Sequence, residues 1–562
     1  MKLTFLGAAH EVTGSRFLLQ ACGKNIMVDY GMEQGADLYE NTPLPITEAA
    51  IDAVLLTHAH IDHSGYLPLL YKNGFRGHVY ATEPTTDLCR IMLLDSAHIQ
   101  ESDAEWKNRK NQRSGKPLVE PLYTQEHALG VHGQFVPCRY KDKVDIFDGI
   151  SIRLVDIGHL LGSCAVEVTV NEDGAEKTIV FSGDVGNIRQ PLLRDPEPMQ
   201  KADYVVVEST YGDRTHGPVP DYIGNLTEII QSTLDKGGNV IIPSFAVGRT
   251  QELLYFIRHI KQHGLVKGHD HFPVYVDSPL AVEATNVFKE NTYECADEET
   301  LELLKQGINP IACPDLQLSI TADDSKALNT DPVPKVIISS SGMCDAGRIR
   351  HHLKHNLWRA ESTVLFVGYQ SVGTLGRSLV DGAKQVKLFS ETVEVNARID
   401  TLAGKSGHAD QNGLLDWVSH FDPKPQHVFV VHGEDDVTDT FAALLKEKQG
   451  LSASAPYNGE SWDLTTLKKL ADGNDERIKK PSRDAAAADA APSNSSPSHQ
   501  PKQPAKQEKK KTQNVSPSYS QLLVAMDKLQ NVVERMRNRS KRDQNKLTSQ
   551  INNLVRRFGG KR

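Results

Sequence analysis

The sequence predicts an α/β protein, with a mostly parallel sheet in the middle of the chain. Two observations carry this prediction. Short apolar runs alternate with stretches of helical period, and polar residues with metal-ligand chemistry follow several of these runs directly. Alternating strands and helices are typical of a mostly parallel sheet. The loops at the ends of such strands are where α/β folds place their chemistry.

The alternation is clearest in the middle of the chain. The expected strands are Asn239–Phe245, Pro273–Val276, Val336–Ser339 and Thr363–Val367, and the expected helices are Tyr222–Leu234 and Thr250–Lys261. This segment is too long for a loop, so it must contain a domain of its own. At the N-terminus, residues 1–10 include a short apolar run but lack the long apolar core of a signal peptide. We interpret them as the first strand of the fold.

Four candidate metal ligands lie within six residues, directly after the expected buried strand Ile51–Leu56. They are His58, His60, Asp62 and His63. Imidazole nitrogen and carboxylate oxygen are the ligands that a catalytic zinc prefers, because they leave a position open for water. His58 and His60 can point the same way from an extended segment, whereas the other two point to a neighbouring site. A lone pair of histidines is more often a solvated turn, but four ligands in this order favour a centre with two metals.

Three further ligand candidates follow apolar strands elsewhere in the chain. They are His159 after Ser151–Ile157, Asp184 after Lys177–Phe181, and His432 after Gln426–Val431. Each adjoins a glycine, which allows the backbone to approach closely. Any one of them taken singly fits a buried core histidine or a turn aspartate equally well. Their shared placement at strand ends favours one common site.

The order of these ligands resembles the signature of the metallo-β-lactamase fold superfamily, a His-x-His-x-Asp-His run followed by a later His, Asp and His. The resemblance implies an αββα sandwich that holds two zinc ions per chain. One zinc would be held by His58, His60 and His159, and the other by Asp62, His63 and His432, with Asp184 bridging both. Such a pair, roughly 3.5–4 Å apart, lowers the pKa of a bridging water toward neutrality, and the resulting hydroxide attacks the phosphorus.

A second set of motifs lies in the domain between the metal ligands. These motifs occupy residues 208–214, 243–252, 276–281, 339–343, 368–377 and 406–410. They resemble the β-CASP family of nucleic-acid-cleaving metallo-β-lactamase proteins, in the branch of the mRNA 3′-end processing endonuclease subunit and its bacterial and archaeal relatives. The resemblance covers roughly residues 1–470. It implies a metallo-β-lactamase domain in two parts, 1–210 and 396–472, with an α/β β-CASP domain, 211–395, inserted between them.

The resemblance also implies catalytic residues. Glu208, His408 and His432 match the motif A, B and C positions of the family, and a histidine at the third position resembles its RNA-acting members. His408 would be the general acid that protonates the leaving 3′-oxygen, and Glu208 would hold it cationic and oriented. Asp62, already a ligand candidate, is counted with these two as catalytic.

The glycine- and serine-rich segments 339–343 and 368–377 offer backbone N–H groups and hydroxyls at close range. Such groups suit the binding of phosphates, although glycine-rich turns are common without one. The candidate RNA contacts in these segments are Ser340, Ser341, Gly342, Tyr369, Gly373, Thr374 and Arg377.

The charge is unevenly distributed. The chain of 562 residues has a net charge of −9, yet residues 481–562 hold 17 Lys/Arg against 6 Asp/Glu. A basic tail suggests an anionic polymer as partner, although many basic tails only aid solubility. Residues 473–516 are expected to be a disordered linker, and 517–562 a basic amphipathic helix with coiled-coil spacing. This helix could associate with itself, dock on a partner or on the rest of the chain, or contact RNA.

We therefore expect a zinc-dependent ribonuclease that cuts single-stranded RNA, with an endonuclease favoured over a 5′-exonuclease. The alternatives are a hydrolase of small esters or phosphodiesters on the same scaffold, and an RNA-binding scaffold with a structural metal site. A homodimer aided by the C-terminal helix is expected. The chain has no apolar stretch of membrane-spanning length. Its seven scattered cysteines are typical of a reduced, cytoplasmic protein.

Overall fold

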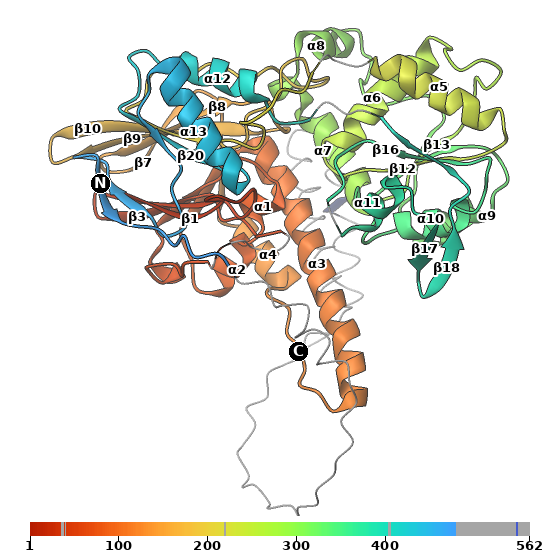
Figure 1. Ribbon diagram of the computed structural model, residues 1–562, viewed down its shortest axis with the longest axis horizontal. Coiled ribbons are helices and arrows are strands. Elements are labelled where there is room, and N and C mark those ends of the chain that lie inside the picture. The colour runs from red at the N-terminus through yellow and green to blue at the C-terminus, as the bar shows by residue number, and fades with distance from the viewer. Residues whose placement is uncertain are drawn as a thin grey trace, which may run out of the picture. The chain divides into compact units, whose positions relative to one another are not determined.

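Three large sheets make up the part of the chain whose structure is described (Figure 1). The computed structural model describes residues 1–34, 39, 41–217, 221–371, 373–402, 406–478 and 547–548. Residues 1–478 form one unit and 479–562 a second. The predicted linker and C-terminal helix therefore lie outside the described residues, apart from 473–478 and 547–548.

The first sheet has eight strands in the order β23-β22-β1-β2-β3-β4-β5-β6. In that order they are Lys468–Ala471, Ser461–Asp463, Lys2–Gly7, Arg16–Ala21, Lys24–Val28, Ala53–Leu55, His78–Thr82 and Phe135–Cys138. Strand β1 confirms the first strand expected at the N-terminus, and β4 confirms the strand expected before the histidine cluster. Helices α2 (Leu67–Lys72), α3 (Glu83–Ser114) and α4 (Gln125–His132) pack beside this sheet, and a short 3₁₀ turn, Glu48–Ala50, precedes β4.

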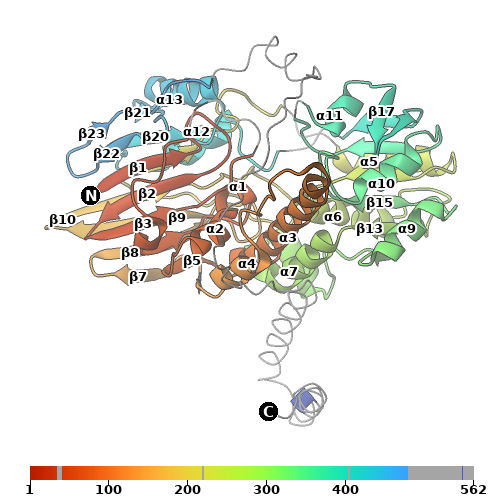
Figure 2. The ribbon, with the colours of Figure 1, turned by 90° about the horizontal axis from the view of Figure 1, so that it is seen from below.

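The second sheet has seven strands in the order β21-β20-β11-β10-β9-β8-β7. In that order they are Ala453–Ser454, His427–Val431, Tyr204–Glu208, Ala175–Phe181, Cys164–Glu172, Ile150–Asp156 and Lys143–Phe147. Side chains of both sheets, including Phe5, Phe17, Phe181 and Phe429, form the core between them. Helices α12 (Gln411–Ser419) and α13 (Asp435–Gln449) cover the far face of the second sheet (Figure 2). This is the αββα sandwich that the resemblance implied.

The third sheet has six strands in the order β14-β13-β15-β12-β16-β19, and every neighbouring pair is parallel. The strands are Leu316–Leu318, Val274–Val276, Val336–Ser339, Val240–Pro243, Thr363–Phe366 and Arg398–Thr401. One face packs on α5 (Tyr222–Leu234), α6 (Arg249–Gln262) and α7 (Pro279–Cys295), and the other on α9 (Ala322–Thr330), α10 (Ile349–Asn356) and α11 (Leu375–Val380). The predicted parallel α/β insertion is confirmed.

This inserted sheet reaches Thr401 through β19, which pairs with β16. Helix α8 (Glu298–Lys305) and the hairpin of β17 (Gln385–Leu388) and β18 (Glu391–Glu394) complete its surroundings. The boundaries proposed for the individual domains, at 210, 395 and 472, stay predictions.

The 32-residue helix α3 has no counterpart among the predicted elements. Thr82 caps its N-terminus, where the hydroxyl accepts a hydrogen bond from the N–H of Thr85, and Gly115 caps its C-terminus, where the positive φ of 67° suits a glycine. Its buried residues stop at Ala104, so the second half carries no apolar periodicity that would announce a helix.

All seven cysteines are free thiols, as their scattered spacing predicts. Among the described residues, no helix is long and apolar enough to cross a membrane.

Candidate metal centre

The ligand candidates meet at one edge of the two facing sheets. Strands β10, β11 and β20 are parallel neighbours, so the residues at their carboxyl ends emerge side by side. Asp184 follows β10, Glu208 ends β11, and His432 follows β20. The loop after β4 and the short helix α1 (Ile61–Ser64) bring the histidine cluster to the same place. This is the edge at which α/β folds gather polar groups.

One group of ligand atoms consists of three imidazoles and a carboxylate. The Nδ1 of His60 lies 3.0 Å from Nε2 of His58 and 3.2 Å from Nε2 of His159. The Oδ2 of Asp184 lies 3.5 Å and 3.4 Å from the same two Nε2 atoms. These are the four residues expected around the first zinc.

A second group of ligand atoms lies beside the first and consists of Asp62, His63 and His432. The two imidazole Nε2 atoms are 3.2 Å apart, and Oδ2 of Asp62 is 3.7 Å from Nε2 of His432. The other oxygen of Asp184, Oδ1, is 3.2 Å from His63 and 3.5 Å from His432. The two carboxylate oxygens of Asp184 therefore face the two groups separately, as a bridging ligand requires.

Hydrogen bonds to neighbouring residues fix which imidazole nitrogen faces the centre. Nδ1 of His63 donates to Oδ2 of Asp29 (2.7 Å), and Nδ1 of His159 donates to the carbonyl of Gly407 (3.2 Å). Nδ1 of His432 lies 3.1 Å from the hydroxyl of Thr210. Each contact engages Nδ1 and leaves Nε2 to face the centre. This is the arrangement that orients metal-binding histidines.

The donor set suits divalent cations. Imidazole nitrogens face one another at 3.0–3.2 Å, a separation at which both could donate lone pairs to one cation. Burial lowers the pKa of His58 and of His159 well below the usual value, so both are neutral, as ligands must be. The buried Oδ1 of Asp184 accepts no hydrogen bond from the described residues. Nitrogen and carboxylate donors without thiolate match a catalytic rather than a structural zinc site.

Glu208 and His408 form a separate pair beside this centre. Nδ1 of His408 lies 3.0 Å and 3.2 Å from the two carboxylate oxygens of Glu208. The same carboxylate accepts hydrogen bonds from the backbone N–H groups of Val185 (2.6 Å) and Thr210 (3.2 Å). Burial lowers the pKa of His408, but the carboxylates of Glu208 and Asp184 outweigh it and raise the pKa to about 9. The imidazole is therefore a cation at neutral pH.

The same two residues, with Asp184, form a third cluster of ligand type. We favour an ion pair there over a metal site. The Glu208 carboxylate is already satisfied by two N–H groups and by the imidazole, and a protonated Nδ1 has no lone pair to offer a cation.

A cavity of about 700 Å³ adjoins the centre. Its lining includes His60, Asp62, His159 and His408 from the αββα sandwich, and Phe245, Arg249 and Tyr369 from the inserted sheet and its loops. Phe245 and Tyr369 are 48% and 65% exposed, so two aromatic residues are open to a ligand near the histidine cluster.

The candidate RNA contacts are spread more widely than the sequence suggested. Of the seven, Tyr369 lines the cavity. Thr374 caps α11 by accepting from the N–H of Arg377, and the guanidinium of Arg377 pairs with Asp381 at 2.8 Å. The Ser341 hydroxyl bonds within its own loop, to the carbonyl of Ala346. Gly342 lies behind Phe245, Ser340 is half-buried, and Gly373 is exposed.

Several residues of the site were not predicted individually. Asp29 and Thr57 form a hydrogen-bonded pair that orients His63 and His58. Asp29 follows strand β3 directly, and this strand-end position is the signal that could have revealed it. Phe245 lies inside a recognised motif but reads as an ordinary strand residue. Its exposure depends on the shape of the cavity.

We expect Gly31→Ala to weaken this centre. A Cβ at Gly31 would lie 1.6 Å from the carbonyl oxygen of Asp62, which is backbone and cannot move aside cheaply. Urea unfolding should show a loss of about 1–3 kcal/mol, and elemental analysis a lower metal content, because the Asp62 turn must shift. Gly133→Ala is the matched control, since its Cβ meets nothing closer than 3.4 Å. Equal stability and metal content in both variants would contradict this packing.

Family models match three parts of the chain. Residues 18–204 match a metallo-β-lactamase superfamily domain, 250–379 a β-CASP domain, and 392–456 the RNA specificity domain of zinc-dependent metallo-hydrolases. The three matches follow one another along the chain without overlap.

Curated relatives match along most of the chain. Ribonuclease TTHA0252 of Thermus thermophilus is 38% identical over 446 residues, which cover 79% of this chain and 96% of the relative. Transcription termination factor FttA of Pyrococcus abyssi is 30% identical over 477 residues, covering 82% and 70%. The chain therefore belongs to the β-CASP ribonuclease family of the metallo-β-lactamase superfamily.

Proposed function

We propose that this protein is a zinc-dependent ribonuclease that hydrolyses phosphodiester bonds of single-stranded RNA, with two zinc ions per chain. The observation that supports this most strongly is the cavity of about 700 Å³, which combines the ligand cluster, the His408–Glu208 pair and two exposed aromatic rings. A relative is named as a ribonuclease, in agreement with this proposal.

The seven ligand candidates would hold the two ions. One ion would be held by the imidazoles of His58, His60 and His159, and the other by Asp62, His63 and His432. Asp184 would be shared by both. When bound, the ions would supply a Lewis acid for the phosphate and lower the pKa of water between them. The residues themselves contribute orientation, because Asp29, Thr210 and the Gly407 carbonyl keep the Nε2 atoms facing the centre.

His408 is the proposed general acid. Its Nδ1 is engaged by Glu208, so Nε2 is the atom left to give a proton to the leaving 3′-oxygen. A pKa of about 9 keeps that proton in place at neutral pH. Glu208 is the positioning residue, because it is buried and held by two backbone N–H groups.

The two exposed rings favour RNA over a small ester as the substrate. Bases of a single strand stack on aromatic faces irrespective of sequence, and Phe245 and Tyr369 offer such faces within the cavity that holds the histidines. A small-ester hydrolase has no need of a second domain as the wall of its site. A purely structural metal would not need the His408–Glu208 pair.

The test uses RNA labelled at either end. The favoured endonuclease should cut within the chain, so that RNA labelled at the 5′ end and RNA labelled at the 3′ end both give labelled fragments of intermediate length. A chelator should abolish these fragments. Release of single nucleotides from the 5′ end would instead identify a 5′-exonuclease. No cleavage by zinc-loaded protein would contradict the proposed function.

We expect truncation after Asp475 to leave zinc content and the cleavage of short RNA nearly unchanged. All proposed catalytic groups lie before that residue. If the C-terminal helix joins two chains, light scattering should give a smaller particle for the truncated protein, and Leu529→Asp in the full chain should do the same. A truncated protein that fails to cut short RNA would show that the catalytic part extends into the tail.

A further inference from the structure

The second half of α3 extends beyond the sheets that its first half covers (Figure 1). The buried residues of this helix end at Ala104, and none of residues 105–114 is buried. Most helices in proteins are stabilised by packing of an apolar face. A half-helix without such a face adds nothing to the core, so its conformation must be maintained by other contacts.

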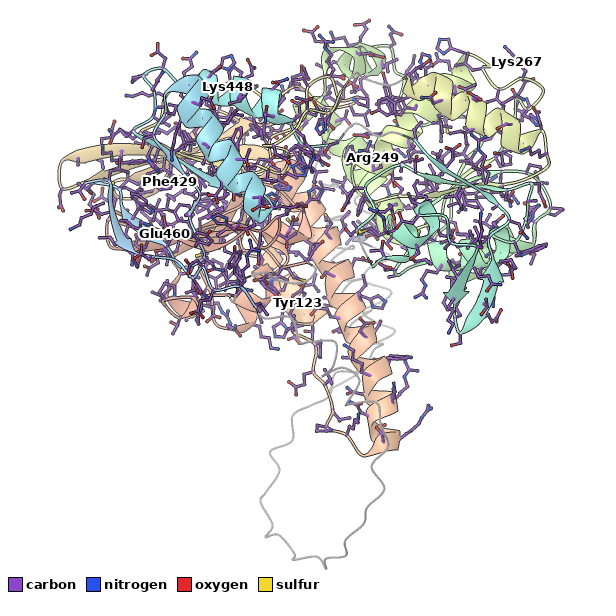
Figure 3. The ribbon with its side chains drawn as sticks, viewed as in Figure 1. Tyr123, Arg249, Lys267, Phe429, Lys448 and Glu460 are labelled. Carbon is purple, nitrogen blue, oxygen red and sulfur yellow. The ribbon has the colours of Figure 1, made fainter. Side chains whose placement is uncertain are left out.

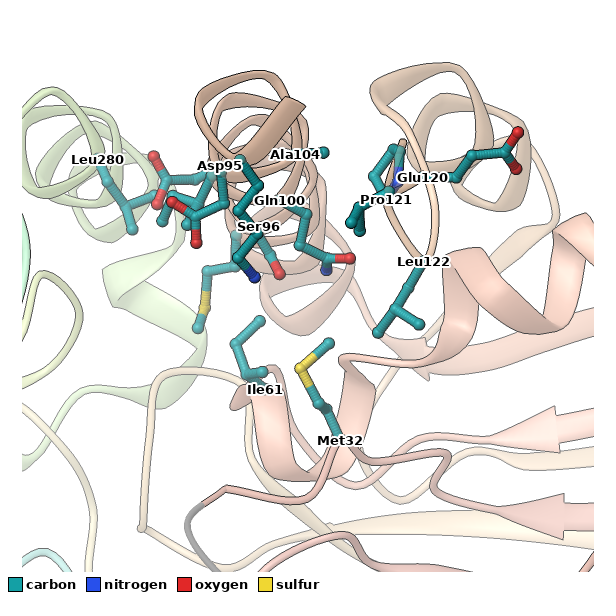
Figure 4. Close-up of a pocket in the computed structure, with 15 residues that line it drawn as sticks. Met32, Ile61, Asp95, Ser96, Gln100, Ala104, Glu120, Pro121, Leu122 and Leu280 are labelled. Atoms are coloured by element: carbon teal, nitrogen blue, oxygen red, sulfur yellow. The ribbon is translucent and has the colours of Figure 1, made fainter. Parts of the chain in front are cut away.

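Two asparagines supply those contacts. The side chain of Asn108 donates to the carbonyl of Val119 (2.8 Å) and accepts from its N–H (2.7 Å), and Asn111 donates to the carbonyl of Pro117 (2.8 Å). The returning chain is thereby bound along one face of α3. Nearer the sheets it is separated from α3 by a cavity of about 540 Å³ (Figure 4).

The opposite face carries one tryptophan and three cations: Trp106, Arg109, Lys110 and Arg113, here called the α3 stripe. Spacings of three, four and seven residues place them on one side of the helix. Trp106 is 62% exposed, and Nζ of Lys110 lies 5.9 Å from its ring centroid. The three cations are exposed, and none forms an ion pair with a described residue. No acidic residue occurs between 106 and 119.

This combination fits a single strand of nucleic acid. An exposed indole offers a stacking face for a base, and cations at helical spacing meet successive phosphates. Other exposed apolar side chains of this region, Ile99, Leu118, Val119 and Leu122, precede or follow the stripe in the chain, and only Trp106 stands among cations. Two exposed carboxylates lie within one turn of the stripe: Asp103, three residues before Trp106, and Glu105, four residues before Arg109. The four cations of residues 107–113 outnumber them, so this end of the helix keeps a net positive charge.

The helix also leads away from the active site. Met92 of α3, with Ile61 and Leu280, lines both the 700 Å³ cavity and the 540 Å³ cavity. From Met92 to Trp106 the helix rises about 21 Å, at roughly 1.5 Å per residue. At roughly 3.4 Å per stacked nucleotide, about six nucleotides span that distance. A short RNA in the active site would not reach the stripe, whereas a long one would.

We propose that the α3 stripe is a second RNA-binding surface, which increases affinity for long single-stranded substrates without taking part in the chemistry. The proposal rests on the proposed ribonuclease function. Its occupant is the sugar-phosphate strand of the substrate itself, at a distance from the scissile bond.

The test compares RNAs of about five and about 30 nucleotides, because site sizes of roughly 4–16 nucleotides are typical for such surfaces. Trp106→Ala, and separately Arg109→Glu with Lys110→Glu, should raise KM for the long RNA about five- to hundred-fold. They should leave its kcat and the cleavage of the short RNA unchanged. The double charge reversal should also flatten the salt dependence, and Trp106→Phe should restore most of the affinity.

The matched control reverses two exposed lysines elsewhere, Lys267→Glu with Lys448→Glu. Both lie far from the free end of α3 (Figure 3). An unchanged KM for long RNA in the stripe variants, or an equal rise in the control, would overturn the proposal. So would a smaller particle mass for the stripe variants in light scattering, which would identify a subunit contact. If the unaltered protein cuts neither RNA, the proposed function itself fails. If it cuts both and the stripe variants match it, only this inference fails.

Discussion

Asp184→Ala should lose most of its zinc and nearly all of its ribonuclease activity. The two oxygens of this carboxylate face different ligand groups, at 3.2–3.5 Å from four imidazole nitrogens. Removing it takes a ligand from both proposed ions and leaves two cations facing each other without a shared anion. Because loss of a residue that merely supports a ligand costs roughly 10–100-fold in affinity or activity, loss of this shared ligand should exceed roughly 100-fold.

The measurements are elemental analysis of protein never exposed to chelator, and cleavage of labelled RNA. The unaltered chain should contain close to two zinc ions. Asp145→Ala is a matched control, because it removes an 80% exposed carboxylate from β7 of the same sheet. A variant that lacks Asp184 yet retains both ions would contradict the bridging role.

His408→Ala should retain its zinc and lose roughly 10²–10⁴ of its rate, the usual contribution of a general acid. This side chain contacts Glu208 at 3.0 Å, whereas its nearest approach to Asp184 is longer, at 3.9 Å. Metal content and rate should therefore separate in this variant, unlike in Asp184→Ala. The exposed His420 provides the control substitution. Loss of zinc from His408→Ala would mean that the imidazole is a ligand and that the acid lies elsewhere.

The grouping of the ligand candidates at one edge could be predicted from sequence because its signal is local. Each ligand candidate directly follows a strand with a strong apolar pattern, and the structure ends those strands within one or two residues of the predicted positions, as at β10 and β20. Bringing Glu208 and His408 together, 200 residues apart, needed the family resemblance. Neither spacing nor composition links them.

The unpredicted features depend on tertiary context. The sequence Thr-Leu-Gly-Arg at 374–377 is compatible with a phosphate-binding loop and with a helix cap. In this fold it is a cap: Thr374 caps α11, and Arg377 pairs with Asp381. From its place at the end of an apolar strand, Phe245 is expected in the core, but in the structure it lines the cavity and is exposed. The far half of α3 has no apolar face from which a helix could be predicted. It is stabilised instead by hydrogen bonds from the side chains of Asn108 and Asn111 to residues 119 and 117.

The central claim is that RNA cleavage takes place at the His/Asp cluster and depends on the metal held there. The most direct measurement follows one preparation through three states: as purified, after zinc is removed and its absence verified by elemental analysis, and after zinc is restored. Cleavage of end-labelled RNA should be present, absent and present again, and the restored rate should track zinc bound up to two ions per chain. Cleavage that persists in verified zinc-free protein, or that fails to return when both ions are bound again, would contradict the account.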